Sequence, residues 1–96
     1  MTIEKSIELF VNYISNERRL SAGTVEKYSH DLRRFQSFLE EQEVLELDDM
    51  TARNIRDWQM DLMQTNCGPR STNRALSALR SWCRYLRKQG YYHADP

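Results

Sequence analysis

The chain has 96 residues, 40% of them hydrophobic and 29% charged, and 14 Lys and Arg balance 14 Asp and Glu to a formal net charge of zero at pH 7. This length and composition are typical of one globular domain and exclude a disordered tail. No apolar run approaches the roughly 18 residues of a membrane span, and the first ten residues lack the basic and apolar regions of a signal peptide. We therefore expect a single domain over residues 1–96 and no membrane partner.

Cysteine and histidine usage indicates neither a metal site nor a disulfide framework. Cys67 and Cys83 fit no zinc-binding spacing, and His30 and His93 do not cluster with them. Cys83 falls on the apolar side of a predicted helix, where a free thiol behaves as a small hydrophobic group. We expect a reduced, cytoplasmic protein with no cofactor.

The first half of the chain predicts two helices, over residues 2–17 and 21–41. Thr2 and Ser21 stand where a side-chain oxygen can accept a hydrogen bond from a first-turn amide. Apolar residues recur at spacings of three and four in both segments, which places them on one face of each helix. These residues are Ile3, Ile7, Phe10, Val11 and Ile14 in the first helix, and Val25, Tyr28, Leu32, Phe35, Phe38 and Leu39 in the second.

An acidic, irregular segment over residues 42–50 follows, and we expect Leu45 and Leu47 to hold it against the core. A third helix is predicted over residues 51–65, with its apolar face formed by Ile55, Trp58, Leu62 and Met63. Gly68 and Pro69 then interrupt the helical pattern, because both residues oppose helix continuation.

The fourth helix is predicted over residues 71–89, with Ser71 as its N-cap and Gly90 in the left-handed conformation at its C-terminus. Its apolar face consists of Leu76, Leu79, Trp82, Cys83 and Leu86. Asp95 and Pro96 predict an extended exit from the domain.

No segment shows the alternation of a strand, so the sequence predicts an all-α fold, a compact bundle of four helices. The core should be formed by the inward faces of all four. Its predicted members are Ile7, Phe10, Ile14, Val25, Leu32, Phe35, Leu39, Ile55, Trp58, Leu62, Leu76, Leu79, Trp82 and Leu86.

Charge is distributed unevenly along the chain. Residues 1–69 carry 8 Lys and Arg against 13 Asp and Glu, whereas residues 70–96 carry 6 against 1. No acidic residue occurs between Asp61 and Asp95. Such asymmetry indicates that one surface is kept free of carboxylates, as a polyanionic partner requires.

Catalysis by this chain is not expected. His30 and Arg33 match the pattern His-x-x-Arg, but they lie within a predicted helix with no further polar constellation nearby. Tyr91 and Tyr92 are better explained by packing over the end of the fourth helix than as nucleophiles. No Ser/His/Asp arrangement, metal cluster or phosphate-binding glycine loop is present.

The fourth helix carries the residue types that bind DNA. Arg, Asn, Ser and Thr read base edges in the major groove or contact phosphates, and small residues allow close approach of the backbone. The candidates are Arg70, Ser71, Thr72, Asn73, Arg74, Ser77, Arg80, Ser81 and Arg84. On the polar side of the second helix, Thr24, Lys27, Asp31 and Arg34 follow one another at helical spacing. A basic face that is merely solvated explains the composition equally well. Base stacking by the aromatic residues is less favoured than core packing, because they share the spacing of their aliphatic neighbours.

Two motifs resemble the core-binding domain of tyrosine recombinases of the phage-integrase and Xer type. The first is Leu20-Ser21-x-x-Thr24 followed by Tyr28-x-x-Asp31-Leu32-Arg33-Arg34-Phe35. The second is Ser71-Thr72-x-Arg74-x-Leu76-Ser77-Ala78-Leu79-Arg80-Ser81-Trp82-x-x-Tyr85-Leu86, followed by Gly90 and then Asp95-Pro96. The likeness covers essentially the whole chain, and the second motif is the more specific; Asn73 departs from the usual pattern.

The resemblance implies a SAM-like four-helix bundle that clamps duplex DNA from one side. A larger C-terminal domain of the same parent chain, which carries the catalytic Arg, His and Tyr residues in this family, would clamp the other side, and further protomers would join in a synaptic complex. DNA contacts carried over from the family are Thr24, Lys27, Arg34, Ser71, Arg74, Ser77 and Arg80. The alternative function is a protein-interaction module whose basic fourth helix docks an acidic protein.

Overall fold

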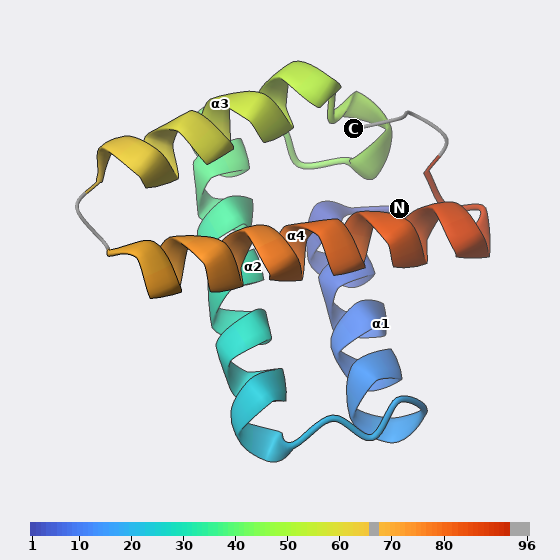
Figure 1. The fold of residues 1–96 in the computed structure, drawn as a ribbon. Coiled ribbons are helices and arrows are strands. Elements are labelled where there is room, and N and C mark those ends of the chain that lie inside the picture. The colour runs from blue at the N-terminus through green and yellow to red at the C-terminus, as the bar shows by residue number, and fades with distance from the viewer. Residues whose placement is uncertain (66–67, 93–96) are drawn as a thin grey trace.

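The computed structural model describes residues 1–65 and 68–92, and these ranges form four α-helices and one short 3-10 helix (Figure 1). Their bounds are α1 Ile3–Asn16, α2 Ala22–Glu41, η1 Leu47–Asp49, α3 Ala52–Gln64 and α4 Pro69–Gln89. Within the described ranges there is no strand beyond one isolated bridge between Thr2 and Glu46. The predicted all-α fold is therefore confirmed, and each helix lies within about two residues of its expected bounds. The predicted exit through Asp95 and Pro96 lies outside the described residues.

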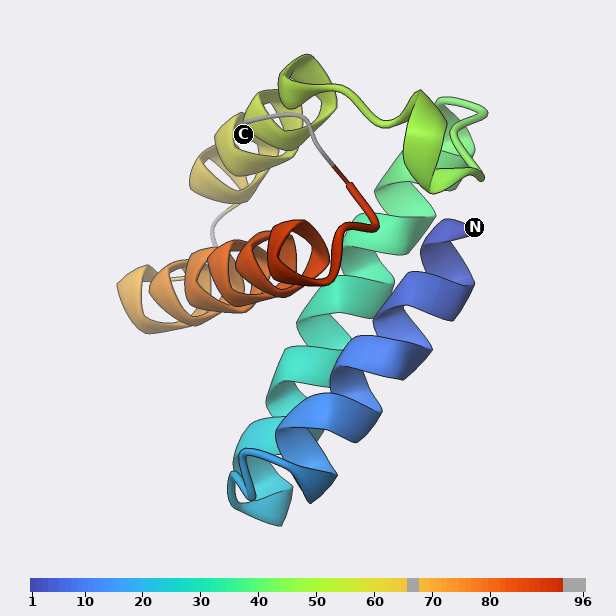
Figure 2. The ribbon, with the colours of Figure 1, turned by 90° about the vertical axis from the view of Figure 1, so that its right-hand side faces the viewer.

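The helices form two layers that cross. α1 and α2 lie side by side and antiparallel, and α4 crosses both of them, as Figures 1 and 2 show. α3 packs against the C-terminal half of α2 and runs beside α4, so that α2 touches all three other helices. This arrangement brings one side of α2 and one side of α4 into a shared corner, and a different side of α4 faces α3.

Local capping sets the starts of the first three long helices, and the caps predicted at Thr2 and Ser21 are confirmed. The Thr2 hydroxyl accepts the Lys5 amide at 3.0 Å, and the Ser21 hydroxyl accepts the Thr24 amide at 3.2 Å. Thr51 and Asn54 form a reciprocal capping box at the start of α3. Each bond satisfies an amide that has no partner within its own helix.

The predicted N-cap of the fourth helix, Ser71, is wrong. α4 begins at Pro69, and Gly68 precedes it with a positive φ of 85°. Proline suits the first helical position, because its fixed φ is already helical and the amide it lacks would have no partner there. The predicted C-terminus is confirmed: Gly90 has φ 76°, in the left-handed region that glycine adopts without strain, and its amide bonds to the carbonyl of Arg87 at 3.1 Å.

The core agrees with the predicted set except at its edges. Twelve of the predicted residues are buried, whereas Val25 and Leu76 are only partly covered. Met63, expected on the inner face of α3, is 70% exposed, because it lies one residue beyond Leu62 and so points about 100° away from it. Buried hydrophobic residues missing from the predicted core are Ile3, Leu47, Met50, Ala75, Ala78, Cys83 and Tyr92.

The loop between α2 and η1 is held mainly through its backbone. The Ile3 amide donates to the Leu45 carbonyl at 2.9 Å, and the Leu47 amide donates to the Met1 carbonyl at 2.9 Å. Leu47 is buried as expected, but the Leu45 side chain is 58% exposed, which corrects its predicted role. Leu47 and Met50 are buried, and Val44 packs against the core, so these side chains anchor the segment in place of Leu45.

Tyr92 closes the bundle over the end of α4, as predicted for this tyrosine pair. Its ring is buried, and its hydroxyl donates to the carbonyl of Met50. Burial raises the pKa of Tyr92, so the phenol keeps its proton and remains a donor.

Tyr92→Phe is expected to destabilise the fold by about 1 kcal/mol, because the buried Met50 carbonyl then lacks a partner. Urea unfolding of the two proteins measures the difference. Tyr91→Phe is the matched control, since the Tyr91 ring is partly exposed and packs edge-on against Tyr85. Equal losses in the two variants would contradict the structural role of the Tyr92 hydroxyl.

Candidate nucleic-acid interface

An ion pair joins α2 to α4 where the two helices cross. Arg74 Nε donates to Asp31 Oδ2 at 2.9 Å, and Arg74 Nη2 donates to Asp31 Oδ1 at 3.2 Å. The Asp31 side chain is fully buried, whereas the Arg74 side chain is 33% exposed. The hydrogen bond to Asp31 raises the pKa of Arg74 beyond its already high usual value, so the guanidinium keeps its charge. Two parallel bonds of this kind fix orientation as well as distance.

This geometry corrects the expectation for Asp31 and adds a role for Arg74. The periodicity placed Asp31 on the polar side of its helix together with Lys27 and Arg34, but Asp31 is buried beneath α4. The sequence signal that could have indicated this ion pair is a single carboxylate, Asp31, between two cations on the same side of the helix. Arg74 uses two of its N–H groups on Asp31, and its remaining donors lie on a partly exposed guanidinium.

The candidates on α2 share the Asp31 side of that helix. Thr24, Lys27 and Arg34 are three to seven residues from Asp31, a spacing that keeps them on one helical side. Lys27 is exposed, and Arg34 is partly buried. The Thr24 hydroxyl accepts a hydrogen bond from Ser21 at 2.9 Å, so it belongs to the first turn of α2. Together with Asp31, these three residues form a row along α2 that passes the point where α4 crosses it.

The candidates on α4 fall on different sides of the helix. Helical spacing puts Arg70, Ser77 and Ser81 on the outer surface toward the Arg74 side, and Ser71 on the inward edge of that same side. Thr72 and Asn73 line a hollow at the start of the helix, together with Pro69 and residues of α3. Arg80 and Arg84 line a groove between α4 and α3. Only some of the predicted residues of α4 therefore share a surface with Arg74. The others line two hollows between α4 and α3.

The groove between α3 and α4 has a cavity volume of about 190 Å³. Its lining consists of Ile55, Gln59, Leu79, Arg80, Cys83, Arg84 and Arg87. Burial raises the pKa of Cys83 to about 12, so the group in its floor is a neutral thiol. The groove therefore combines an apolar floor with a basic rim, a combination that the periodicity of one helix does not reveal.

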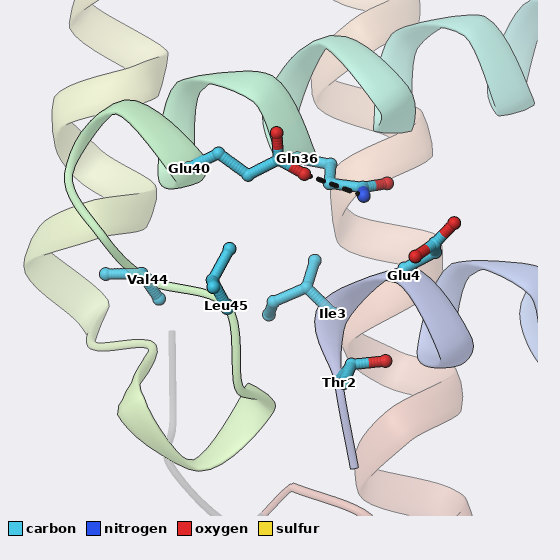
Figure 3. A pocket seen from close by; sticks show the side chains of 7 residues that line it. All are labelled: Thr2, Ile3, Glu4, Gln36, Glu40, Val44 and Leu45. Atoms are coloured by element: carbon cyan, nitrogen blue, oxygen red, sulfur yellow. Dashed lines mark hydrogen bonds between the residues drawn. The ribbon is translucent and has the colours of Figure 1, made fainter.

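Acidic side chains gather on another part of the surface. The end of α2 and the loop through η1 carry Glu40, Glu41, Glu43, Glu46, Asp48 and Asp49, all exposed. This region leads into α3, where Gln42 accepts a hydrogen bond from Asn54 at 3.3 Å, and Figure 2 shows it away from the start of α4. Figure 3 shows a shallow pocket beside it, where Leu45 and Val44 lie near Ile3 of α1, and Glu40 accepts a hydrogen bond from Gln36. Six exposed carboxylates thus gather at this end of α2.

His30 and Arg33, which match the pattern His-x-x-Arg, do not form a polar cluster with each other. His30 is exposed, and Arg33 donates to Gln36 at 2.9 Å along its own helix. Within residues 1–65 and 68–92, no group of His, Cys, Asp and Glu could hold a metal ion. In the same ranges no helix is both long enough and apolar enough to span a bilayer.

Comparison with known proteins identifies relatives over the whole chain. The family described as "Phage integrase, N-terminal SAM-like domain" matches residues 7–90. Tyrosine recombinase XerC of Oceanobacillus iheyensis is 32% identical over 94 residues, which cover 98% of this chain and 31% of the relative. Tyrosine recombinase XerC of Listeria welshimeri is 31% identical, covering 100% of this chain and 32% of the relative.

Tyrosine recombinase XerD of Rickettsia prowazekii is 33% identical over 90 residues, which cover 94% of this chain and 29% of the relative. The chain therefore spans about a third of the length of these curated relatives. No solved structure is significantly similar to it.

Proposed function

Because the chain belongs to the family of phage integrase N-terminal SAM-like domains, we propose that it binds duplex DNA on the side where α2 and α4 cross. The observation that carries the proposal is the Asp31–Arg74 pair, which locks two cation-bearing helices into one corner. Asp31 itself is buried, so it does not present its charge to a phosphate. The exposed carboxylates of the α2–η1 loop belong to a segment that Figure 2 shows away from the start of α4.

In this arrangement α4 lies in or against the major groove. Ser77 and Ser81 are short enough to let the helix approach the base edges, and Arg74 offers the donors that Asp31 leaves unused. Lys27 and Arg34 on α2 meet phosphates, together with Arg70 near the start of α4. Thr24, Ser71, Thr72, Asn73, Arg80 and Arg84 are further candidates at the margins of this surface.

We further propose that the chain is the DNA-clamping part of a site-specific recombinase. Its relatives are named tyrosine recombinases, and they are about three times as long as the chain. A C-terminal catalytic domain of the same parent chain would break and rejoin the strands, and other protomers would assemble on the recombination site in the cytoplasm.

Lys27→Ala and Arg34→Ala are expected to weaken duplex binding on all sequences alike and to lower the slope of log K against log salt by about 1 each, because each change removes a phosphate contact. Binding by the isolated chain should lie near the non-specific range of about 10⁻⁴–10⁻⁶ M, since it clamps one side of the DNA only. Fluorescence anisotropy with a labelled duplex at two salt concentrations measures both quantities.

Arg53→Ala and Arg56→Ala on α3 are the matched controls, because both side chains are exposed cations away from the α2–α4 corner. Equal losses from these changes would show that the chosen surface is wrong. If all four variants bind like the parent, the protein-interaction module becomes the better explanation.

A further inference from the structure

The α3–α4 groove lies on the opposite side of α4 from the Asp31–Arg74 pair. Cys83 in its floor follows Arg74 by nine residues, which is two and a half helical turns. The floor of the groove therefore lies on the other side of α4 from Arg74, whereas Arg80 and Arg84 at its edge also stand at the margin of the surface assigned to DNA. The use of the groove proposed below is tested without DNA, so it does not depend on that assignment.

The groove fits one kind of occupant, an aliphatic side chain flanked by carboxylates. Ile55, Leu79 and the neutral Cys83 supply an apolar floor, and Arg80 and Arg84 stand at its edge. A cavity of about 150 Å³ with an apolar lining holds a molecule the size of benzene, so the 190 Å³ here has room for one leucine. Guanidinium groups bind carboxylates in paired, directional hydrogen bonds.

The chain itself carries a segment of this chemistry. Residues 40–49 contain six exposed carboxylates, and within them Leu45 leaves 58% of its surface in solvent. Figure 3 shows the Leu45 side chain in the pocket beside Ile3. Leu45 lines a pocket with Ile3 of α1, and no residue of this loop lines the α3–α4 groove, so Leu45 does not occupy the groove of its own copy.

We propose that the acidic loop of one copy docks into the α3–α4 groove of a second copy, with Leu45 on the apolar floor and the neighbouring carboxylates on Arg80 and Arg84. Each copy then offers one loop and one groove, so the contact is heterologous and leaves an unused loop and groove at the two ends of a pair. The contact area is small, so self-association should be weak, in the millimolar range, and should weaken with salt.

Charge reversal on either surface tests the pairing. Glu43→Arg reverses a loop charge, and Arg84→Glu reverses a groove charge; both positions are exposed, so neither change should disturb the fold. Each variant alone should self-associate about tenfold more weakly than the parent, because like charges then face each other. In an equimolar mixture, the loop of the Arg84→Glu protein meets an unchanged groove, and association should return to near the parental level.

Sedimentation and concentration-dependent amide chemical shifts, measured from micromolar to millimolar protein without DNA, give the association constants. Leu45→Ser should weaken association while leaving the charges in place, and Glu8→Arg and Arg18→Glu are matched charge reversals elsewhere on the exposed surface. A parent that stays monomeric, controls that weaken association as much, or a mixture that does not recover would overturn the proposal. Because no DNA is present, its failure would leave the DNA-binding proposal standing.

Discussion

Arg74→Ala is expected to destabilise the fold by about 3 kcal/mol, because it leaves the fully buried Asp31 carboxylate without its partner. Losses of this size arise mainly from the uncompensated charge, and only partly from the lost attraction. Arg74 is one-third exposed, so water reaches the carboxylate once the side chain is removed, and this keeps the loss at the lower end of the usual range. Urea unfolding at neutral pH measures the change.

A double-mutant cycle separates this explanation from a simple loss of packing. Asp31→Leu combined with Arg74→Met removes both charges and keeps apolar volume, so the double variant should be more stable than Arg74→Ala. Arg74→Lys should recover only part of the stability, because an ammonium cannot form the two parallel bonds. If the loss in the double variant equals the sum of the losses in Asp31→Leu alone and Arg74→Met alone, the ion pair contributes nothing.

For DNA binding, the same pair makes Arg74 a different kind of residue from Lys27. Lys27 is exposed and can be removed without disturbing the crossing, whereas Arg74 both holds α4 and offers its remaining donors outward. Any loss of affinity in Arg74→Ala therefore has to be compared with its stability. The affinity should be measured where the variant is fully folded.

Leu79→Ala is expected to cost about 2–5 kcal/mol, since the side chain is almost fully buried and its removal leaves a cavity. Leu79 packs in the core and also forms part of the floor of the α3–α4 groove. Thermal and urea unfolding give the loss. Leu76→Ala, at a half-buried position on the same helix, should cost clearly less. A loss below about half a kcal/mol at Leu79 would mean that another face of α4 is buried.

The helices could be predicted because their determinants are local. Thr2, Ser21 and Thr51 each cap the helix that follows, and apolar spacing defines the inner face of each helix within a few turns. The start of α4 was missed because Gly68-Pro69 was interpreted only as a break. Proline is also favoured at the first position of a helix. Pro69 therefore both follows the end of α3 and begins α4.

The candidate site could be predicted only as a set of residue types. Periodicity places Asp31 on the flank of its helix, but whether a flank is covered depends on where another helix crosses. The same limit applies to α4, whose cations are divided between α2 and α3 by the packing of those helices. The contact of Tyr92 with Met50 joins residues 42 apart in sequence, and no local pattern predicts it.

The bonding of the chain start to the α2–η1 loop has a consequence for the order of folding. The amides of Ile3 and Leu47 pair with carbonyls more than forty residues away, so the first turn of α1 is secured only after α2 and its loop have been made. During synthesis, residues 1–50 can therefore form a hairpin of two helices before α3 emerges from the ribosome. The hydrogen bonds between residues 1–3 and the α2–η1 loop close the open end of this hairpin. The carbonyl of Met50, at the end of that hairpin, receives the Tyr92 hydroxyl only after α4 has been made.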